Sequence, residues 1–126
     1  MTQEPAPPPA PPQHLQYRTN AFGVTVVGFT TSYLQSEVEI NKVAAELLDL
    51  VEKKGLTKLI LTFQGVRFMS SSMLAQLVRL HKLLAKAGGK LRICCLSPTM
   101  MEVIHTSQLD KLLDVVADET AALHKF

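Results

Sequence analysis

The chain has 126 residues, of which 47% are apolar and 19% are charged. These proportions favour one folded domain with its own core and exclude a chain that is disordered throughout. The formal charge of +2 comes from 13 basic and 11 acidic residues scattered along the chain. A nucleic-acid-binding protein typically shows a basic stripe, so we expect no nucleic acid among the partners.

Two cysteines stand next to each other as Cys94 and Cys95. Their spacing fits neither a zinc site nor a C-x-x-C redox motif. We therefore expect two small core residues in a reducing compartment. Because neighbouring side chains in a strand point to opposite faces, the two thiols are expected to diverge. A disulfide between the two neighbours is the less favoured alternative.

Targeting segments are not visible in the sequence. The first twenty residues lack the apolar stretch of a signal peptide. No unbroken apolar run approaches the roughly 18 residues of a membrane span. The sequence therefore predicts a soluble, cytoplasmic protein without membrane insertion.

The first segment, residues 1–14, holds all but one of the seven prolines. A run of this kind predicts an extended, disordered leader, and its PxxP spacing leaves open a ligand for a proline-reading domain. The folded domain is then expected to span residues 15–126.

Strands and helices are expected to alternate after the leader. Residues 14–19 and 23–29 form a predicted hairpin around a turn at 20–23. Ser36 and Glu39 match a capping box at the start of a helix with apolar residues at helical spacing, which Gly55 ends. The later expected elements are a strand at 56–63, a helix at 73–87 closed by Gly88 and Gly89, a strand at 90–96, a helix from Ser97-Pro98 to about Ser107, a strand at 112–116 and a terminal helix capped by Asp118.

The predicted order is thus β-β-α-β-α-β-α-β-α. Strand-helix-strand units favour parallel neighbours joined by right-handed crossovers, whereas the hairpin adds an antiparallel edge. We expect a single α/β domain with a mixed, mostly parallel sheet and an antiparallel N-terminal hairpin.

Signatures of catalysis are missing from the sequence. It contains no phosphate loop, no G-x-G-x-x-G and no G-x-S-x-G, and no paired carboxylates or metal-ligand clusters. None of the four histidines, His14, His81, His105 and His124, stands in a catalytic pattern. A serine nucleophile needs an activating base, so we expect no enzymatic activity, no metal and no cofactor.

Three consecutive serines, Ser70, Ser71 and Ser72, separate two apolar runs where a strand path should give way to a helix. One of them is expected to cap the helix by accepting a backbone N–H bond, which contributes about 1 kcal/mol. A phosphate here would add about two negative charges, which a helix N-terminus tolerates. The modified domain would stay folded, while a partner resting on this surface would meet new charge.

The stretch LILTFQGVRFMSSSMLAQLVRLHKLLAKAGGKLRICCLSPTMMEVIHTSQLDKLLDV matches a longer pattern. It has a strand, a g-V-x-F-h-D-S-S-G-L segment, a helix ending in A-G-G, a strand, S-P, a helix and G-L-x-x-h-h. With this pattern, residues 15 to 125 resemble the STAS domain (sulfate transporter and anti-sigma factor antagonist), especially bacterial single-domain antagonists. The matching residues are Val66, Phe68, Ser71, Ser72, Leu74, Gly88, Gly89, Ser97, Pro98, Leu109 and Leu112.

The resemblance implies a non-catalytic regulatory protein-binding module, an anti-sigma factor antagonist that works by partner switching. Its partners would be an anti-sigma factor that is also a serine-threonine kinase, and a phosphatase that resets the switch; the module itself would be a monomer or weak dimer. By position, Ser71 would accept the phosphate, ahead of Ser72 and Ser70. The partner-binding surface would include Ser70, Ser72, Met73, Thr31, Ser32 and Tyr33.

The sequence departs from the family pattern on both sides of Ser71. Ser70 stands where relatives have aspartate, and Met73 stands where they have glycine. Residues 31–34 replace an E-L-D-like segment. These departures favour an alternative, in which the chain is an unphosphorylated structural STAS subunit of a signalling scaffold or a lipid-transport complex.

Overall fold

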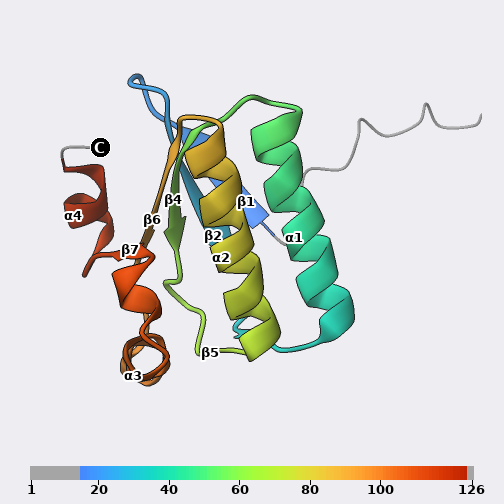
Figure 1. Cartoon of the computed structure of the whole chain (residues 1–126), viewed down its shortest axis with the longest axis vertical. Helices are drawn as coiled ribbons and strands as arrows, with labels where there is room; N and C mark the ends of the chain where they lie inside the picture. Colours follow the sequence, from blue (N-terminus) through green and yellow to red (C-terminus); the bar gives the residue numbers. More distant parts are fainter. Residues whose placement is uncertain (1–14, 125–126) are drawn as a thin grey trace, which may run out of the picture.

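A five-stranded sheet with the order β1-β2-β4-β6-β7 forms the centre of the computed structural model, which describes residues 15–124 (Figure 1). Strand β1 pairs antiparallel with β2, and the other neighbours are parallel. The predicted mixed sheet with its N-terminal hairpin is confirmed, whereas the proline-rich leader lies outside the described residues. The strands are β1 (Leu15–Thr19), β2 (Val24–Phe29), β4 (Lys58–Thr62), β6 (Lys90–Cys94) and β7 (Asp114–Val115).

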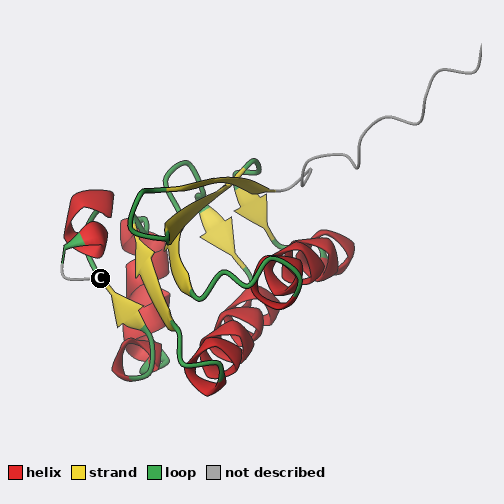
Figure 2. Ribbon diagram, turned by 90° about the horizontal axis from the view of Figure 1, so that it is seen from above, coloured by secondary structure: helices red, strands yellow, loops and turns green. Residues whose placement is uncertain are grey.

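Helices cover both faces of this sheet (Figures 1 and 2). The long helices α1 (Glu37–Glu52) and α2 (Ser71–Lys86) pack on one face, and α4 (Glu119–Leu123) packs on the other. Because successive strand residues alternate, Leu59 and Leu61 join the large core under α1 and α2 while Ile60 faces α4. Buried members of the large core include Leu34, Ile40, Leu47, Phe63, Met73, Leu77, Leu84 and Ile93.

Three short elements were not predicted. Strands β3 (Tyr33–Leu34) and β5 (Phe68–Met69) form a separate parallel pair, and a 3-10 turn, η1 (Leu109–Lys111), follows α3 (Pro98–Thr106). Two residues are too few to show the alternation by which a strand is recognised. The pair matters nonetheless, because it brings two distant segments together at the start of α2.

Helix α2 begins at Ser71, two residues before the predicted start at 73. Its C-terminal end agrees with the sequence. Gly88 adopts a left-handed conformation with φ +77° directly after the helix, and a Cβ at Gly89 would lie 2.3 Å from the backbone oxygen of Thr57. Both glycines are therefore required by the backbone path from α2 into β6.

The N-cap residues of the four helices fall into two groups. Ser97 and Asp118 cap α3 and α4 as predicted, because their side chains accept the N–H groups of Met100 at 3.3 Å and Ala121 at 2.8 Å. Ser36 and Ser70 occupy the N-cap positions of α1 and α2, but neither side chain makes a cap bond. The predicted capping box at Ser36 and the predicted cap bond of the serine triplet are therefore wrong. In Ser70 the Oγ atom is buried without a hydrogen-bond partner among the described residues.

The cysteine pair also differs from expectation. Strand β6 ends at Cys94, and Cys95 turns into the left-handed region with φ 63°. This turn interrupts the strand alternation, so the two sulfur atoms lie 3.6 Å apart instead of on opposite faces. A left-handed backbone costs a residue with a Cβ atom about 1–2 kcal/mol.

Arg92 on β6 fixes the C-terminal part of the chain. Its Nε donates to Asp114 of β7 at 2.9 Å, and its Nη1 donates to the carbonyls of Ala122 at 2.8 Å and His124 at 2.6 Å. Only 12% of the Arg92 side chain is exposed. A single guanidinium therefore connects β6, β7 and α4.

Replacing Arg92 by lysine should lower the free energy of unfolding by about 1.5–3 kcal/mol, since the donors of an ammonium group sit on one nitrogen and cannot reach acceptors that the guanidinium contacts from two separate nitrogens. Urea unfolding measures this loss. The matched control is Arg79→Lys on the exposed side of α2, which should change stability by no more than about 0.5 kcal/mol. Equal effects of the two substitutions would contradict the role assigned to Arg92.

Replacing Ser70 by alanine should leave stability unchanged within about 0.5 kcal/mol or raise it slightly, because the lost hydroxyl is buried and unpaired. The control is Ser97→Ala, which removes a formed cap bond and should cost about 1 kcal/mol. Thermal or urea unfolding of both variants decides the matter. A loss at Ser70 as large as that at Ser97 would show that its hydroxyl does cap α2.

Candidate functional site

The three serines at the start of α2 have three different environments. The hydroxyl of Ser70 is buried. Ser72 is half-buried, and its hydroxyl donates to Oε1 of Glu37, in the first turn of α1, at 2.5 Å. Ser71 is exposed, and its hydroxyl has no hydrogen-bond partner within residues 15–124. Of the three hydroxyls, that of Ser71 is thus the one that faces solvent unengaged.

The position of Ser71 is set by backbone hydrogen bonds from a distant segment. The N–H of Ser70 donates to the carbonyl of Leu34 at 2.8 Å, and the N–H of Arg67 donates to the carbonyl of Ser32 at 2.7 Å. These bonds extend the β3–β5 pair up to the first residue of α2. Residues 31–33 and the serines at the start of α2, which the sequence assigns to one surface, are therefore brought together.

The first turn of α2 has unused backbone donors. The N–H groups of Met73 and Leu74 both donate to the carbonyl of Ser70, at 3.0 and 3.2 Å. Those of Ser71 and Ser72 have no acceptor in the described part of the chain, and this turn has no acidic residue of its own. Free N–H groups and the helix dipole together favour a negative group at this end.

Exposed apolar side chains lie on elements next to the start of α2. Tyr33 and Phe68 are partners in the register of β3 and β5, with 49% and 40% of their surfaces exposed. On α3, Val103 is also exposed, and a shallow cleft separates it from Phe68. We call Ser71, Tyr33, Phe68 and Val103 the α2-start surface. The cleft is lined by Phe68, Met69, Leu74, Thr99, Met100 and Val103.

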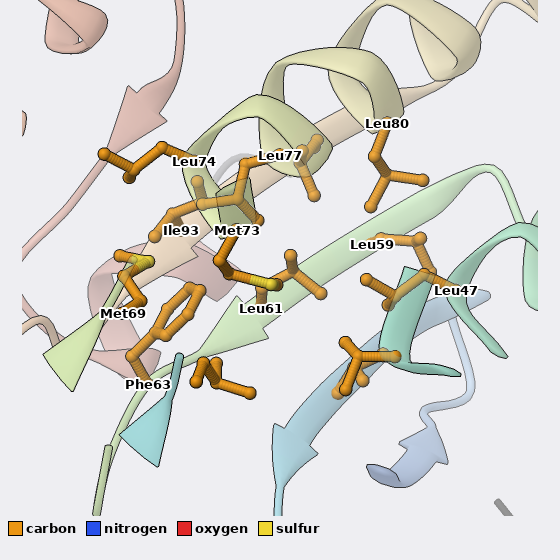
Figure 3. Packing of buried hydrophobic residues seen from close by; sticks show 14 of the residues in the cluster. Leu47, Leu59, Leu61, Phe63, Met69, Met73, Leu74, Leu77, Leu80 and Ile93 are labelled. Carbon is orange, nitrogen blue, oxygen red and sulfur yellow. The ribbon is translucent and has the colours of Figure 1, made fainter. Parts of the chain in front are cut away.

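The sequence places Met73 in a partner-binding surface, whereas the structure buries it completely. Its side chain points from α2 toward Leu61 on the sheet, close to Leu77 on the same helix (Figure 3). The thioether fills core space, so Met73 supports the surface from below. Thr31 and Ser32 lie beside the β3–β5 pair, and the Oγ1 of Thr31 contacts the backbone of Tyr33.

Sequence reasoning missed Phe68, Val103 and Glu37 as residues of this region. Phe68 alternates with the buried Met69, a weak strand signal within two residues. Glu37 and Ser72 are 35 residues apart in the chain, and no local pattern predicts their contact.

Reactive side chains are also grouped away from the serines, near the end of α3. His105 Nδ1 lies 3.0 Å from Asp110 Oδ2, and this hydrogen bond holds the pKa of Asp110 below its ordinary value. The nearby Ser107 hydroxyl donates to the Val103 carbonyl and is not oriented by that histidine. Within residues 15–124, no three His, Cys, Asp or Glu side chains are grouped so as to hold a metal ion. No helix in this range combines the length and apolar character needed to cross a membrane.

Comparison with known proteins agrees with this geometry. The curated "Anti-sigma F factor antagonist" of Paenibacillus polymyxa is 24% identical over 81 residues, which cover 64% of this chain and 69% of the relative. A solved anti-sigma-factor antagonist (STAS) domain protein from Planctomyces limnophilus superposes with a TM-score of 0.76 at 25% identity, covering 86% of this chain and 94% of that one. The phosphorylated form of the Bacillus cell fate determinant SpoIIAA superposes with a TM-score of 0.65 at 20% identity, covering 85% and 95%.

A family model described as "STAS domain" matches residues 36–122. This match includes α1, β4, β5 with the serines that follow it, and the later elements up to Ala122 in α4. The chain therefore belongs to the STAS domain family.

Proposed function

We propose that the chain is a cytoplasmic anti-sigma factor antagonist, a non-catalytic module whose binding to an anti-sigma factor is switched by phosphorylation of Ser71. The observation that carries this proposal is the exposed, unengaged hydroxyl of Ser71 at the first position of α2. A kinase has to reach the hydroxyl oxygen and take its proton. Of the three serines, Ser71 meets that requirement without any rearrangement of the domain.

The neighbouring serines are poorer acceptors for opposite reasons. Phosphorylation of Ser70 would require its buried Oγ to leave the protein interior. Phosphorylation of Ser72 would break its hydrogen bond to Glu37 and set a phosphate against that carboxylate. Like charges in contact destabilise each other, so Ser72 is the second choice.

The first turn of α2 can accommodate the phosphate. The unused N–H groups of Ser71 and Ser72 and the positive end of the helix dipole would offset part of its charge. The modification therefore acts on binding and leaves the fold intact. A partner that covers Tyr33 and Phe68 would have to desolvate the new charge or move away from it.

The comparisons support the class of partner. One relative bears the name of an anti-sigma factor antagonist, and a protein of the same fold has been solved in a phosphorylated form. The proposed cycle has an anti-sigma factor with serine-threonine kinase activity, which binds the unmodified chain and phosphorylates it, and a phosphatase that restores binding. The chain itself contributes the surface and the acceptor hydroxyl.

The replacement of the family's usual aspartate by Ser70 has a structural counterpart. Glu37 brings a carboxylate from α1 to the first turn of α2, where it contacts Ser72. A negative group thus remains in the first turn of α2, in contact with the residue that follows the acceptor serine, although it comes from another helix. This arrangement favours the switch over the alternative of an unphosphorylated structural subunit of a scaffold or lipid-transport complex.

Incubation with anti-sigma factor kinases of the source organism should place phosphate on Ser71. Tryptic cleavage yields residues 68–79, which contain all three serines, and fragment-ion mass spectrometry assigns the site. Ser71→Ala should abolish most of the modification, whereas the control Ser72→Ala should retain it. Phosphate on Ser72, or none from any such kinase, would contradict the assignment and favour the structural subunit.

Ser71→Asp should weaken binding to the anti-sigma factor by at least about tenfold, equivalent to about 1.4 kcal/mol, because it adds charge to the α2-start surface. Its unfolding free energy should change by less than about 1 kcal/mol, since the carboxylate faces the helix dipole. Calorimetry with the isolated anti-sigma factor and urea unfolding measure the two quantities. The matched control is Ser71→Asn, of similar size without the charge, which should bind more tightly than Ser71→Asp. Loss of the fold in Ser71→Asp, or equal binding by the two variants, would rule out a charge-based switch.

A further inference from the structure

We propose that Cys94 and Cys95 form a redox-sensitive vicinal dithiol, which closes to an internal disulfide when Cys95 meets a small disulfide-type oxidant. The two sulfur atoms already lie 3.6 Å apart. The pair is located where β6 ends, on the face of the sheet covered by α4, and contacts the small core of Val24, Ile60 and Ala122. It does not depend on phosphorylation at Ser71.

The backbone of Cys95 creates this contact. In a continued strand the two side chains would point to opposite faces. The left-handed conformation of Cys95, with φ 63°, returns its side chain toward Cys94. Backbone strain in a residue other than glycine is often found where a protein uses a special side-chain arrangement. Here the strain and the thiol contact involve the same residue.

The two thiols differ in access. Cys94 is completely buried, whereas Cys95 is partly exposed. Burial, strengthened by the hydrogen bond with Cys95, raises the pKa of Cys94 to about 12. Cys94 is thus shielded from direct attack and remains a thiol at neutral pH. An external reagent meets Cys95 first, and Cys94 is then positioned to complete the reaction from inside.

The chemistry has two exchange steps. The Cys95 thiolate attacks one sulfur of a low-molecular-weight disulfide, forms a mixed disulfide and releases one thiolate. The Cys94 sulfur then attacks Sγ of Cys95, and its proton passes to the second thiolate as that thiolate departs. The protein loses two electrons and two protons in total, and the oxidant is reduced to two thiols.

The resulting bond would be strained and therefore reversible. Consecutive Cα atoms across a trans peptide lie about 3.8 Å apart, whereas ordinary disulfides join Cα atoms about 4.4–6.8 Å apart. Strained disulfides are more easily reduced than structural ones. The pair is thus suited to a transient oxidised state and unsuited to a permanent staple.

Ring closure would also act on two backbone hydrogen bonds. The carbonyl of Cys94 accepts from the N–H of Phe63 at 3.0 Å, and the N–H of Cys95 donates to the carbonyl of Ala117 at 3.2 Å. The first bond connects the ends of β4 and β6, and the second connects β6 to the segment before α4. Rotation of the peptide between the cysteines would weaken both connections.

Glutathione disulfide is a suitable probe for the full chain, because the two cysteines are its only thiols. After excess oxidant and trapping of free thiols with N-ethylmaleimide, the tryptic peptide 93–111 contains both residues. In the wild-type chain, this peptide should carry no adduct and should be lighter than the reduced peptide by two hydrogen atoms. Dithiothreitol should restore both thiols, and the melting temperature of the oxidised chain should be lower than that of the reduced chain.

Two variants separate the roles of the cysteines. Cys94→Ala should stop at a stable glutathione adduct on Cys95, whereas Cys95→Ser should remain unmodified over the same time. Circular dichroism checks that both variants are folded; Cys94→Val is the substitute if the alanine variant is not. A persistent glutathione adduct on the wild-type chain, a Cys95-linked dimer on a non-reducing gel, or no reaction with glutathione disulfide would each overturn the proposal.

Discussion

Burial of β4 on both faces is the constraint on which the rest of the structure depends. Leu59 and Leu61 require α1 and α2 on one side, and Ile60 requires α4 on the other. Because β4 is covered on both faces, the chain reaches solvent only after the carboxyl end of this strand. Open α/β sheets place their functional surfaces at this end of their strands. Phe63 is still buried and packs against Phe29, so the chain becomes exposed only beyond it. The short β5 strand and the serines belong to the segment that follows Phe63.

The parts of the fold that the sequence predicts are those with a repeated local signal. Strands β1, β2, β4 and β6 and the four helices have apolar periodicity over five or more residues or a clear cap, as at Ser97 and Asp118. Strand β7 is short, but its apolar run follows a helix and fits the expected parallel order. The β3–β5 pair has neither signal, because two residues per strand are held by partners more than thirty positions away.

The candidate site was predictable only in part, for the same physical reason. The position of the serines at the start of α2 follows from local sequence, and Ser71 is singled out by resemblance to a family. What distinguishes the three hydroxyls is their surroundings, which depend on Glu37 and on the packing beneath Ser70. Met73 illustrates the limit: its place in the motif indicates a surface, whereas its spacing with Leu77 indicates the core, and packing decides for the core. The thiols of Cys94 and Cys95 lie in contact because Cys95 has a positive φ angle, which no residue pattern predicts.

The contact between Glu37 and Ser72 has a further consequence for the two long helices. Helices α1 and α2 run in the same direction and start at the same end of the molecule (Figure 1). Each start has a partial charge of about +0.5 from its aligned peptide dipoles, so the two ends repel each other. Glu37 belongs to the first turn of α1 and touches the first turn of α2, so one carboxylate compensates both dipoles. A phosphate on Ser71 would compete with the Glu37 carboxylate for the positive ends of the two helix dipoles. The first turn of α1, which carries the exposed Val38, would then respond to phosphorylation of Ser71 on α2.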